Sequence, residues 1–179
     1  MSGGAGRRPQ IAVIGAGDAP EAALRDAEEL GRRLVDAGCR VVCGGLGGVM
    51  AAVARGARSS PRASGSDVVG ILPTTDAGAA NGWVDVVVPT GLGHARNVVV
   101  VASADAVVAV GGAAGTLSEL ALAWQLGRPV VALATHGGWA ADLAGRAVDA
   151  RRDDVVHAAR TPADAVRLAL ELSAAAPEG

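Results

Sequence analysis

The chain has 179 residues, half of them hydrophobic, which predicts one domain with a full core. Its net charge is −2, and its 16 basic residues, all arginine, form no dense positive stripe, which argues against nucleic acid as a partner. The first ten residues lack an apolar signal segment, and the longest apolar run, 98–110, is interrupted and too short to span a bilayer, so we expect a cytoplasmic protein with no membrane partner.

Apolar runs alternate with helical segments along the chain. In chain order, the expected strands are 10–15, 40–43, 67–72, 84–88, 105–110, 129–133 and 155–157. The expected helices are 18–37, 49–58, 94–103, 116–126, 140–149 and 162–173. This alternation predicts right-handed crossovers and an α/β fold with a mostly parallel sheet. We expect a single domain over 9–174, with disordered tails at 1–8 and 175–179.

The first helix has a recognisable start and end. Asp18 precedes Pro20 and Glu21, which predicts a capping box in which the Asp18 side chain caps the helix and Glu21, three residues later, makes the reciprocal contact. Gly38 suits the left-handed end of the same helix.

The two cysteines, Cys39 and Cys43, flank the second strand. Positions four apart in a strand are separated by about 13 Å. Because a disulfide needs Cα atoms within about 7 Å, we expect free buried thiols, which fits a reducing compartment.

The segment before the fifth strand is ambiguous. Val98–Val101 are four consecutive β-branched residues, which are poor helix formers, yet the strand 105–110 follows at once, so we predict a helix. A helix that is apolar on all sides must be buried, and a subunit contact is one way to cover it. Whether the turn-rich loop 73–82 closes over a site is left open.

Glycine clusters follow several strands. They stand in the turns at 15–17, 44–48, 91–93 and 111–115. In parallel sheets, ligands bind beyond the carboxyl ends of the strands, where helix starts offer free N–H groups to an anion and glycine lets the backbone approach it. The alternative is that these glycines only make tight turns. We favour a site for a phosphate group, although the first turn has Pro20 where a dinucleotide fingerprint needs its third glycine.

Two charged side chains are candidates for the chemistry. Arg96 lies in the first turn after Gly93 and can hold a phosphate in a bidentate pair, with Asn97 beside it. Thr116 and Glu119 fit either a capping box or a ligand contact, in which Glu119 binds a ribose hydroxyl or assists bond cleavage. A carboxylate beside a helix start is expected to be stabilised as the anion.

Other reactive side chains are dispersed. His94, His136 and His157 are far apart, and no His or Cys pair has the spacing of metal ligands, so we expect no metal site. Ser103 and Ser118 have no base nearby in the sequence, which leaves a hydrolytic triad unsupported.

Four segments resemble a known family. They are CGGLGGVMAAVARGA, GILP, TGLGHARNVVVVASADAVVAVGG and GTLSELALAWQLGRPVVAL. Together, over about 10–135, they resemble the LOG-like Rossmann superfamily, which contains the LONELY GUY phosphoribohydrolases and relatives of the DNA-processing protein DprA. They resemble in particular its bacterial subgroup with the molybdenum cofactor carrier proteins. The resemblance implies a Rossmann-like three-layer sandwich and a homodimer or homotetramer.

The resemblance also implies roles for individual residues. In LONELY GUY enzymes a PGGxGTxxE motif and a nearby arginine bind a nucleoside 5′-monophosphate and cleave its N-glycosidic bond. Gly112, Gly115, Thr116 and Glu119 match that motif, and Arg96 matches the catalytic arginine. Three positions depart from it: glycine replaces proline at Gly111, alanine replaces glycine at Ala113, and asparagine replaces lysine at Asn97.

Three functions are consistent with these observations. The first is a binding or carrier protein for a nucleotide or a molybdopterin-type cofactor, with no further cofactor required. The second is a phosphoribohydrolase with Arg96 and Glu119 as catalytic residues. The third, a DprA-like nucleic-acid binder, is disfavoured by the charge. The candidate ligand-binding residues are Gly15, Gly17, Gly44, Gly45, Gly47, Gly48, Met50, Arg96, Asn97, Gly111, Gly112, Gly115, Thr116 and Glu119.

Overall fold

A computed structural model describes residues 7–175 of the chain. Its strands are β1 (Gln10–Gly15), β2 (Arg40–Cys43), β3 (Val68–Leu72), β4 (Val86–Pro89), β5 (Ala106–Val110), β6 (Val130–Leu133) and β7 (His157–Ala159). The α-helices are α1 (Glu21–Asp36), α2 (Val49–Ser59), α3 (Arg96–Ala102), α4 (Ala114–Gln125), α5 (Gly138–Leu143) and α6 (Pro162–Ala175). Short 3-10 turns occupy Ala77–Ala79, Gly93–Ala95 and Ala134–His136. Of the expected tails 1–8 and 175–179, residues 1–6 and 176–179 lie outside the described residues, whereas Arg8 hydrogen-bonds to the fold and Ala175 ends α6.

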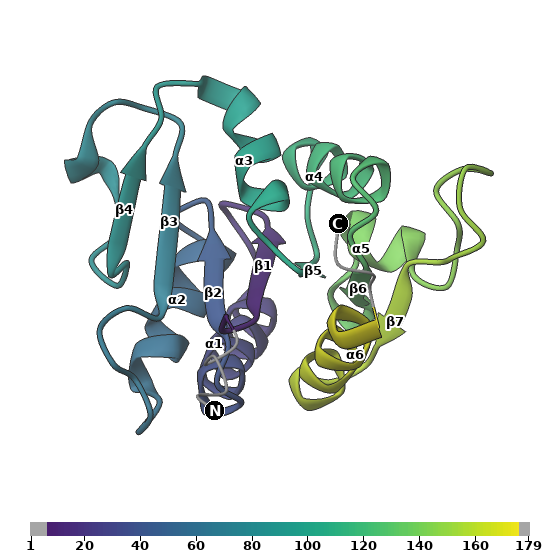
Figure 1. Cartoon of the computed structure of the whole chain (residues 1–179), viewed down its shortest axis with the longest axis horizontal. Coiled ribbons are helices and arrows are strands. Elements are labelled where there is room, and N and C mark those ends of the chain that lie inside the picture. Colours follow the sequence, from purple (N-terminus) through teal and green to yellow (C-terminus); the bar gives the residue numbers. More distant parts are fainter. Residues whose placement is uncertain (1–6, 176–179) are drawn as a thin grey trace, which may run out of the picture.

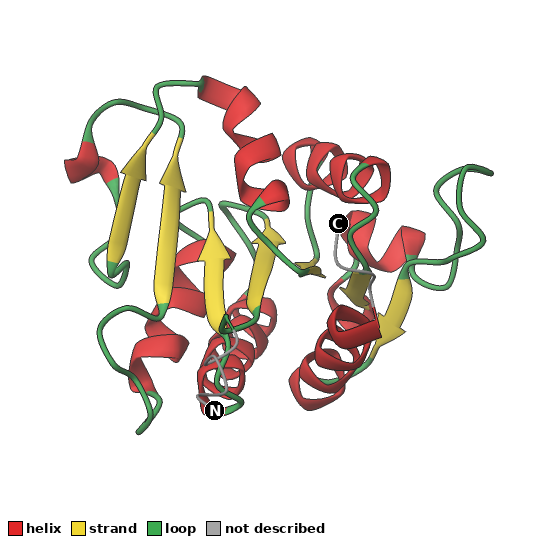
Figure 2. Cartoon of the chain, in the orientation of Figure 1, coloured by secondary structure: helices red, strands yellow, loops and turns green. Residues whose placement is uncertain are grey.

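The strands form one parallel sheet of seven strands in the order β4-β3-β2-β1-β5-β6-β7 (Figures 1 and 2). The chain moves outward from β1 to β4, then returns to β5 on the other side of β1 and moves outward again. The predicted α/β fold with a mostly parallel sheet in a three-layer sandwich is therefore confirmed.

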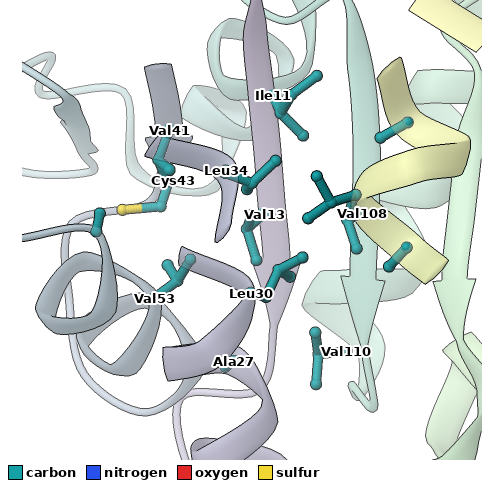
Figure 3. Packing of buried hydrophobic residues seen from close by; sticks show 14 of the residues in the cluster. Ile11, Val13, Ala27, Leu30, Leu34, Val41, Cys43, Val53, Val108 and Val110 are labelled. Atoms are coloured by element: carbon teal, nitrogen blue, oxygen red, sulfur yellow. The ribbon is translucent and has the colours of Figure 1, made fainter. Parts of the chain in front are cut away.

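Each face of the sheet has its own buried cluster of small branched residues. On one face, Leu30 and Leu34 of α1 gather around Val13 of β1 (Figure 3), and residues of α2 and α6 belong to the same cluster. On the other face, α3, α4 and α5 cover β1, β5 and β6. The valine-rich strands predicted a sheet buried on both faces, and the centre of the sheet has that arrangement.

Three local predictions need correction. α1 begins at Glu21 with Pro20 as its N-cap and no side-chain cap, so Asp18 does not cap it. α4 begins two residues earlier than expected, with Ala113 as its N-cap and no side-chain cap, which overturns the capping-box interpretation of Thr116 and Glu119. The short helix predicted at 140–149 spans Gly138–Leu143 instead.

The valine-rich segment is a helix, as predicted, but it is not buried on every side. Val100 and Val101 of α3 are fully buried, whereas Val98 is 43% exposed. The packing of Val100 and Val101 against the sheet overrides the weak helix propensity of β-branched residues.

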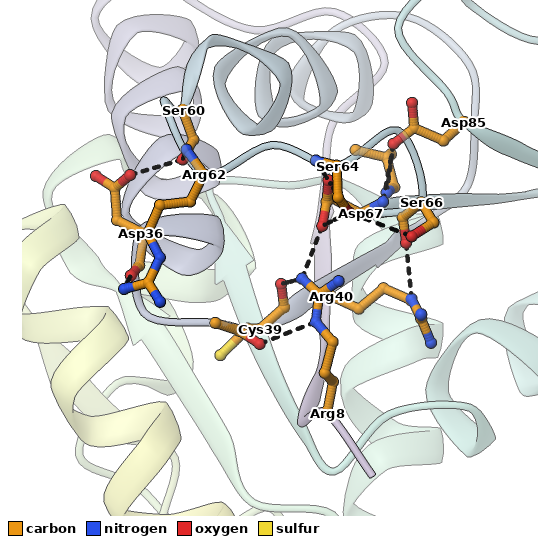
Figure 4. Close-up of polar contacts among 12 residues, drawn as sticks. Arg8, Asp36, Cys39, Arg40, Ser60, Arg62, Ser64, Ser66, Asp67 and Asp85 are labelled. Atoms are coloured by element: carbon orange, nitrogen blue, oxygen red, sulfur yellow. Dashed lines mark hydrogen bonds and ion pairs between the residues drawn. The ribbon is translucent and has the colours of Figure 1, made fainter. Parts of the chain in front are cut away.

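A polar network closes the amino ends of β1, β2 and β3 (Figure 4). Arg8 donates to the main-chain oxygens of Gly38 and Cys39 and to the buried Asp67 carboxylate at 2.7 Å. Asp85 accepts hydrogen bonds from the amides that lead into β3. The free and buried state expected for Cys39 and Cys43 is confirmed.

The contact between α1 and α2 depends on two glycines. A Cβ on Gly56 would lie 1.8 Å from the Glu28 carbonyl oxygen, and one on Gly31 would lie 2.0 Å from the Val53 carbonyl oxygen. The helix backbones therefore touch without intervening side chains.

Gly56→Ala is expected to lower the free energy of unfolding by about 2 kcal/mol. Alanine gains about 1 kcal/mol of helix propensity, but the clash with a backbone oxygen forces the two helices apart. Urea denaturation followed by circular dichroism measures the difference. Gly82→Ala is the control, since a Cβ there meets nothing within 4 Å. A stability of Gly56→Ala equal to or above that of the wild type would contradict this account.

Candidate functional site

A cavity of about 380 Å³ lies at the carboxyl ends of the central strands. It is located between β1 and β5, which lie side by side. After β1 the chain continues toward β2 on one side of the sheet, and after β5 it continues toward β6 on the other side; doubly wound sheets bind ligands at this position. Four segments line it, contributing Val13, Ile14, Gly15, Ala16, Gly17 and Asp18; Gly44 and Met50; His94, Arg96 and Asn97; and Ala113, Gly115, Thr116 and Glu119.

Arg96 is buried in the lining of this cavity, with 9% of its surface exposed. Its Nη1 donates to the carbonyl oxygen of Ile71 at 2.5 Å, at the end of β3. A Cβ on Gly44 would lie 2.1 Å from Nη1, so only glycine at this position leaves room for the guanidinium. Arg96 is therefore held by its surroundings and is not a surface arginine on a helix.

Glu119 lies in the second turn of α4 and is 8% exposed. Burial raises the pKa of its carboxyl to about 7, against the opposing effect of the Arg96 charge. Burial also lowers the pKa of Arg96, while Glu119 counteracts this. The expectation that Glu119 is stabilised as an anion is wrong, because its loss of water on burial outweighs the attraction of the Arg96 charge.

Asn97 joins α3 to the start of α4. Its Nδ2 donates to the Ser118 hydroxyl at 2.9 Å, and that hydroxyl donates to the Gly115 carbonyl oxygen at 2.7 Å. Thr116, which is 3% exposed, lines the cavity next to this chain of hydrogen bonds. The segments that carry Arg96 and Glu119 are thus fixed to each other.

The glycine candidates divide into two groups. Gly15, Gly17, Gly44 and Gly115 line the cavity, as does Met50. Gly45, Gly47, Gly48, Gly111 and Gly112 lie outside its lining.

Three of the glycines outside the lining, Gly45, Gly111 and Gly112, hold neighbouring turns together. The carbonyl oxygens of Gly111 and Gly112 accept hydrogen bonds from the amides of Ala140 and Trp139 at the start of α5. The Gly45 carbonyl oxygen accepts from the backbone and side chain of Asn81, which ties the loop 73–82 to the turn after β2. No residue of that loop lines the cavity.

Sequence reasoning missed two polar residues of the cavity, Asp18 and His94. Asp18 follows the exit of β1, and His94 precedes Arg96 by two positions, so their place beside the strand exits was the available signal. The residue type of Asp18 also suits a helix cap, and His94 is far in the sequence from the other histidines, which hides both from a search for motifs.

The described residues, 7–175, carry neither a cluster of metal ligands nor a membrane-spanning helix. These residues contain no group of three His, Cys, Asp or Glu side chains that could hold a metal ion. None of the helices described is long and apolar enough to cross a membrane.

Proteins similar to this chain are known in sequence and in structure. An uncharacterized protein of Archaeoglobus fulgidus is 44% identical over 124 residues, which is 69% of this chain and 79% of that protein. The structure of TM1055 has a TM-score of 0.82 at 36% identity, covering 91% of this chain and 99% of that one.

Two similar structures carry functional names. The molybdenum cofactor binding protein of Rippkaea orientalis has a TM-score of 0.77 at 30% identity, covering 93% of this chain and 98% of its own. The Moco carrier protein of Chlamydomonas reinhardtii has a TM-score of 0.78 at 34% identity, covering 94% and 99%.

The resemblance found in the sequence agrees with these matches. The sequence model of the SLOG cluster4 family matches residues 8–166, nearly the whole described fold. The chain therefore belongs to the SLOG cluster4 family.

Proposed function

We propose that this chain binds a phosphate-bearing small molecule, a molybdopterin-type cofactor, in the cavity between β1 and β5 and acts as its carrier. The observation that carries the proposal is the similarity to a molybdenum cofactor binding protein and a Moco carrier protein. It extends over more than nine-tenths of this chain and of both relatives, at 30% and 34% identity.

The cavity suits an anionic small molecule such as a molybdopterin-type cofactor. Its volume of about 380 Å³ falls in the range of about 300–1,000 Å³ that is usual for small-molecule sites. The guanidinium of Arg96 supplies charged donors for a phosphate. The start of α4 lies on the cavity through Ala113, Gly115 and Thr116 and adds the positive end of a helix dipole.

The same cavity offers hydrogen-bond acceptors. Asp18 and Glu119 are among its lining residues, and a pterin ring presents N–H groups from which carboxyl oxygens accept hydrogen bonds. A ligand that combines a phosphate with an N–H edge therefore matches both kinds of side chain.

The test uses molybdenum cofactor released anaerobically from a molybdoenzyme. We expect saturable binding to this protein and transfer of the bound cofactor to a cofactor-free molybdoenzyme, measured as restored activity. Adenosine monophosphate serves as a competitor with a phosphate but no pterin. Absence of cofactor binding, with tight binding of the nucleotide, would overturn the carrier role and leave a nucleotide site.

A second candidate function is hydrolysis of nucleoside 5′-monophosphates. The observation in its favour is that Arg96 and Glu119, which match the catalytic pair of LONELY GUY enzymes, line one cavity. In this function Arg96 orients the phosphate-bearing substrate, and the ionised form of Glu119 stabilises the ribosyl cation as the N-glycosidic bond breaks, adenine leaves and water attacks C1′. Incubation with adenosine monophosphate and chromatography for free adenine decides it: adenine release that Glu119→Gln abolishes supports hydrolysis, and its absence excludes it for this substrate.

A further inference from the structure

Glu119 is a buried carboxyl without a polar partner. More than nine-tenths of its surface is buried, and its surroundings act on it through burial and the charge of Arg96, with no hydrogen bond among them. Within residues 7–175, Arg128 Nε is the one fully buried side-chain polar atom that lacks a partner. The unpaired oxygens of Glu119 are therefore not sealed in the core but reach the cavity that this residue lines.

Arg96, the neighbour that acts on Glu119, also has unused hydrogen-bonding capacity. α3 and α4, which carry the two residues, lie side by side (Figure 1). Among the described residues, the carbonyl oxygen of Ile71 is the one acceptor that the Arg96 guanidinium contacts, although a guanidinium has five N–H donors. An anion that enters the cavity can therefore pair with Arg96.

The entry of a phosphate changes the charge balance around Glu119. A phosphate monoester carries close to two negative charges at neutral pH. When it pairs with Arg96, it neutralises the charge that now lowers the pKa of Glu119, and it adds a like charge to the same cavity of about 380 Å³. Both changes favour the protonated carboxyl. By thermodynamic linkage, a ligand that strengthens proton binding is itself bound more tightly by the protonated protein.

We propose that Glu119 takes up a proton when the cavity binds its phosphate-bearing ligand, so that the ligand and one proton enter together and leave together. This inference rests on the proposed phosphate site and adds a means of control to it. A neutral carboxyl has an O–H group that can donate to an anionic oxygen, and its carbonyl oxygen still accepts from an N–H group. The protein therefore loads its ligand more tightly in acidic surroundings and releases it as pH rises.

The other ionisable groups around Glu119 do not supply this proton. The elements packed against α4, which are β1, β5, β6 and α3, contribute one such side chain, Arg96, and a guanidinium stays charged throughout the neutral range. Burial raises the pKa of the Cys43 thiol at the end of β2 to about 11, so this thiol stays neutral. Asp18 and His94 line the cavity from neighbouring turns, and both are exposed, so they serve as controls.

The test is calorimetric titration with molybdenum cofactor between pH 6 and pH 9. Burial raises the pKa of Glu119 to about 7 in the ligand-free protein, and each pH unit above this value makes the protonated site about tenfold rarer. We expect the dissociation constant of the wild type to increase at least about tenfold from pH 7 to pH 9. The phosphate group does not cause this change, because its second pKa is about 6 and its further ionisation strengthens the pairing with Arg96.

Glu119→Gln separates proton uptake from a merely structural role. Glutamine keeps the shape of a protonated glutamate and cannot ionise, so the dissociation constant of the variant should stay constant from pH 7 to pH 9. At pH 9 the variant should therefore bind the cofactor at least about tenfold more tightly than the wild type. Substitution of a merely structural residue would instead weaken binding at every pH. Circular dichroism melting confirms that the variant is folded.

Three further measurements support the assignment. Titration in two buffers of different protonation enthalpy counts the protons directly, and we expect about one per ligand for the wild type at pH 8 and none for Glu119→Gln. Sulfate, which stays doubly charged throughout this range and lacks a pterin, should show the same pH dependence as the cofactor. His94→Gln and Asp18→Asn should retain the pH dependence of the wild type, although an imidazole can also change its charge near neutral pH.

The outcomes distinguish this inference from the carrier function. Cofactor binding with a constant dissociation constant, or with the same pH dependence in Glu119→Gln as in the wild type, would overturn the inference and leave the carrier intact. Loss of the pH dependence in His94→Gln would assign the proton to His94 and overturn it as well. Proton-linked binding of sulfate without any binding of cofactor would support the inference and overturn the carrier. Absence of binding of both ligands at every pH would overturn both proposals.

Discussion

Arg96→Ala is expected to weaken binding of the phosphorylated ligand at least 100-fold while the chain still folds. Arg96 is the arginine that lines the cavity, and a charge-assisted pair to phosphate in a buried site is worth about 2–3 kcal/mol or more. Each factor of ten in affinity corresponds to about 1.4 kcal/mol, so the loss is readily measured by calorimetric titration with molybdenum cofactor.

The matched control is Arg40→Ala. Arg40 also donates to one main-chain oxygen, that of Ser66 (Figure 4), but it lies at the amino end of β2, the end of the sheet opposite to the cavity. Its loss should leave ligand affinity unchanged. Gly44→Ala should reproduce the effect of Arg96→Ala in weaker form, because the added methyl group displaces the guanidinium. An unchanged affinity in a folded Arg96→Ala protein would refute the assignment of this residue.

The fold was largely predictable because its local signals agree. Every strand begins within two residues of its expected start, since valine runs alternate with helical segments throughout. The errors are at helix starts. Asp18 and Thr116 have the residue types of N-caps, but α1 starts after Pro20 and α4 starts at Ala114, and both side chains line the cavity instead.

The site was predictable in part because parallel strands bring their carboxyl ends to one edge. This argument placed Arg96, Asn97, Thr116 and Glu119 near one another, and all four line the cavity. The same argument could not distinguish glycines that face the cavity from those that join turns. Gly111 and Gly112 belong to the second kind because their carbonyl oxygens accept hydrogen bonds from the first amides of α5, a contact that the sequence does not reveal. Nor could it give the ionisation of Glu119, because burial is a property of the packed structure.

Glu119→Gln is expected to gain stability relative to the wild type as pH rises. The pKa of the Glu119 carboxyl is about 7 in the folded protein, against a usual value of 4.5. Between these values the folded chain holds a proton that the unfolded chain has lost, so this group makes the free energy of unfolding fall as pH rises through that window. Each pKa unit corresponds to about 1.4 kcal/mol, and glutamine has no such titration. The stability of the variant relative to the wild type should therefore increase by about 2–3 kcal/mol between pH 4 and pH 8.

Urea denaturation of both ligand-free proteins at several pH values measures the difference between their free energies of unfolding. The contributions of the other titrating groups are the same in both proteins and cancel in this difference. Arg96, whose charge counteracts the shift of Glu119, stays protonated throughout, because a guanidinium remains charged over this pH range. Glu28→Gln is the control: that carboxyl is on the surface of α1, where its hydrogen bond to Arg55 lowers its pKa, so its loss should have a small effect of opposite sign. Parallel pH profiles for Glu119→Gln and the wild type would mean that water reaches this carboxyl freely. Water would then also reach the Arg96 guanidinium, and its attraction for a phosphate group would be weaker.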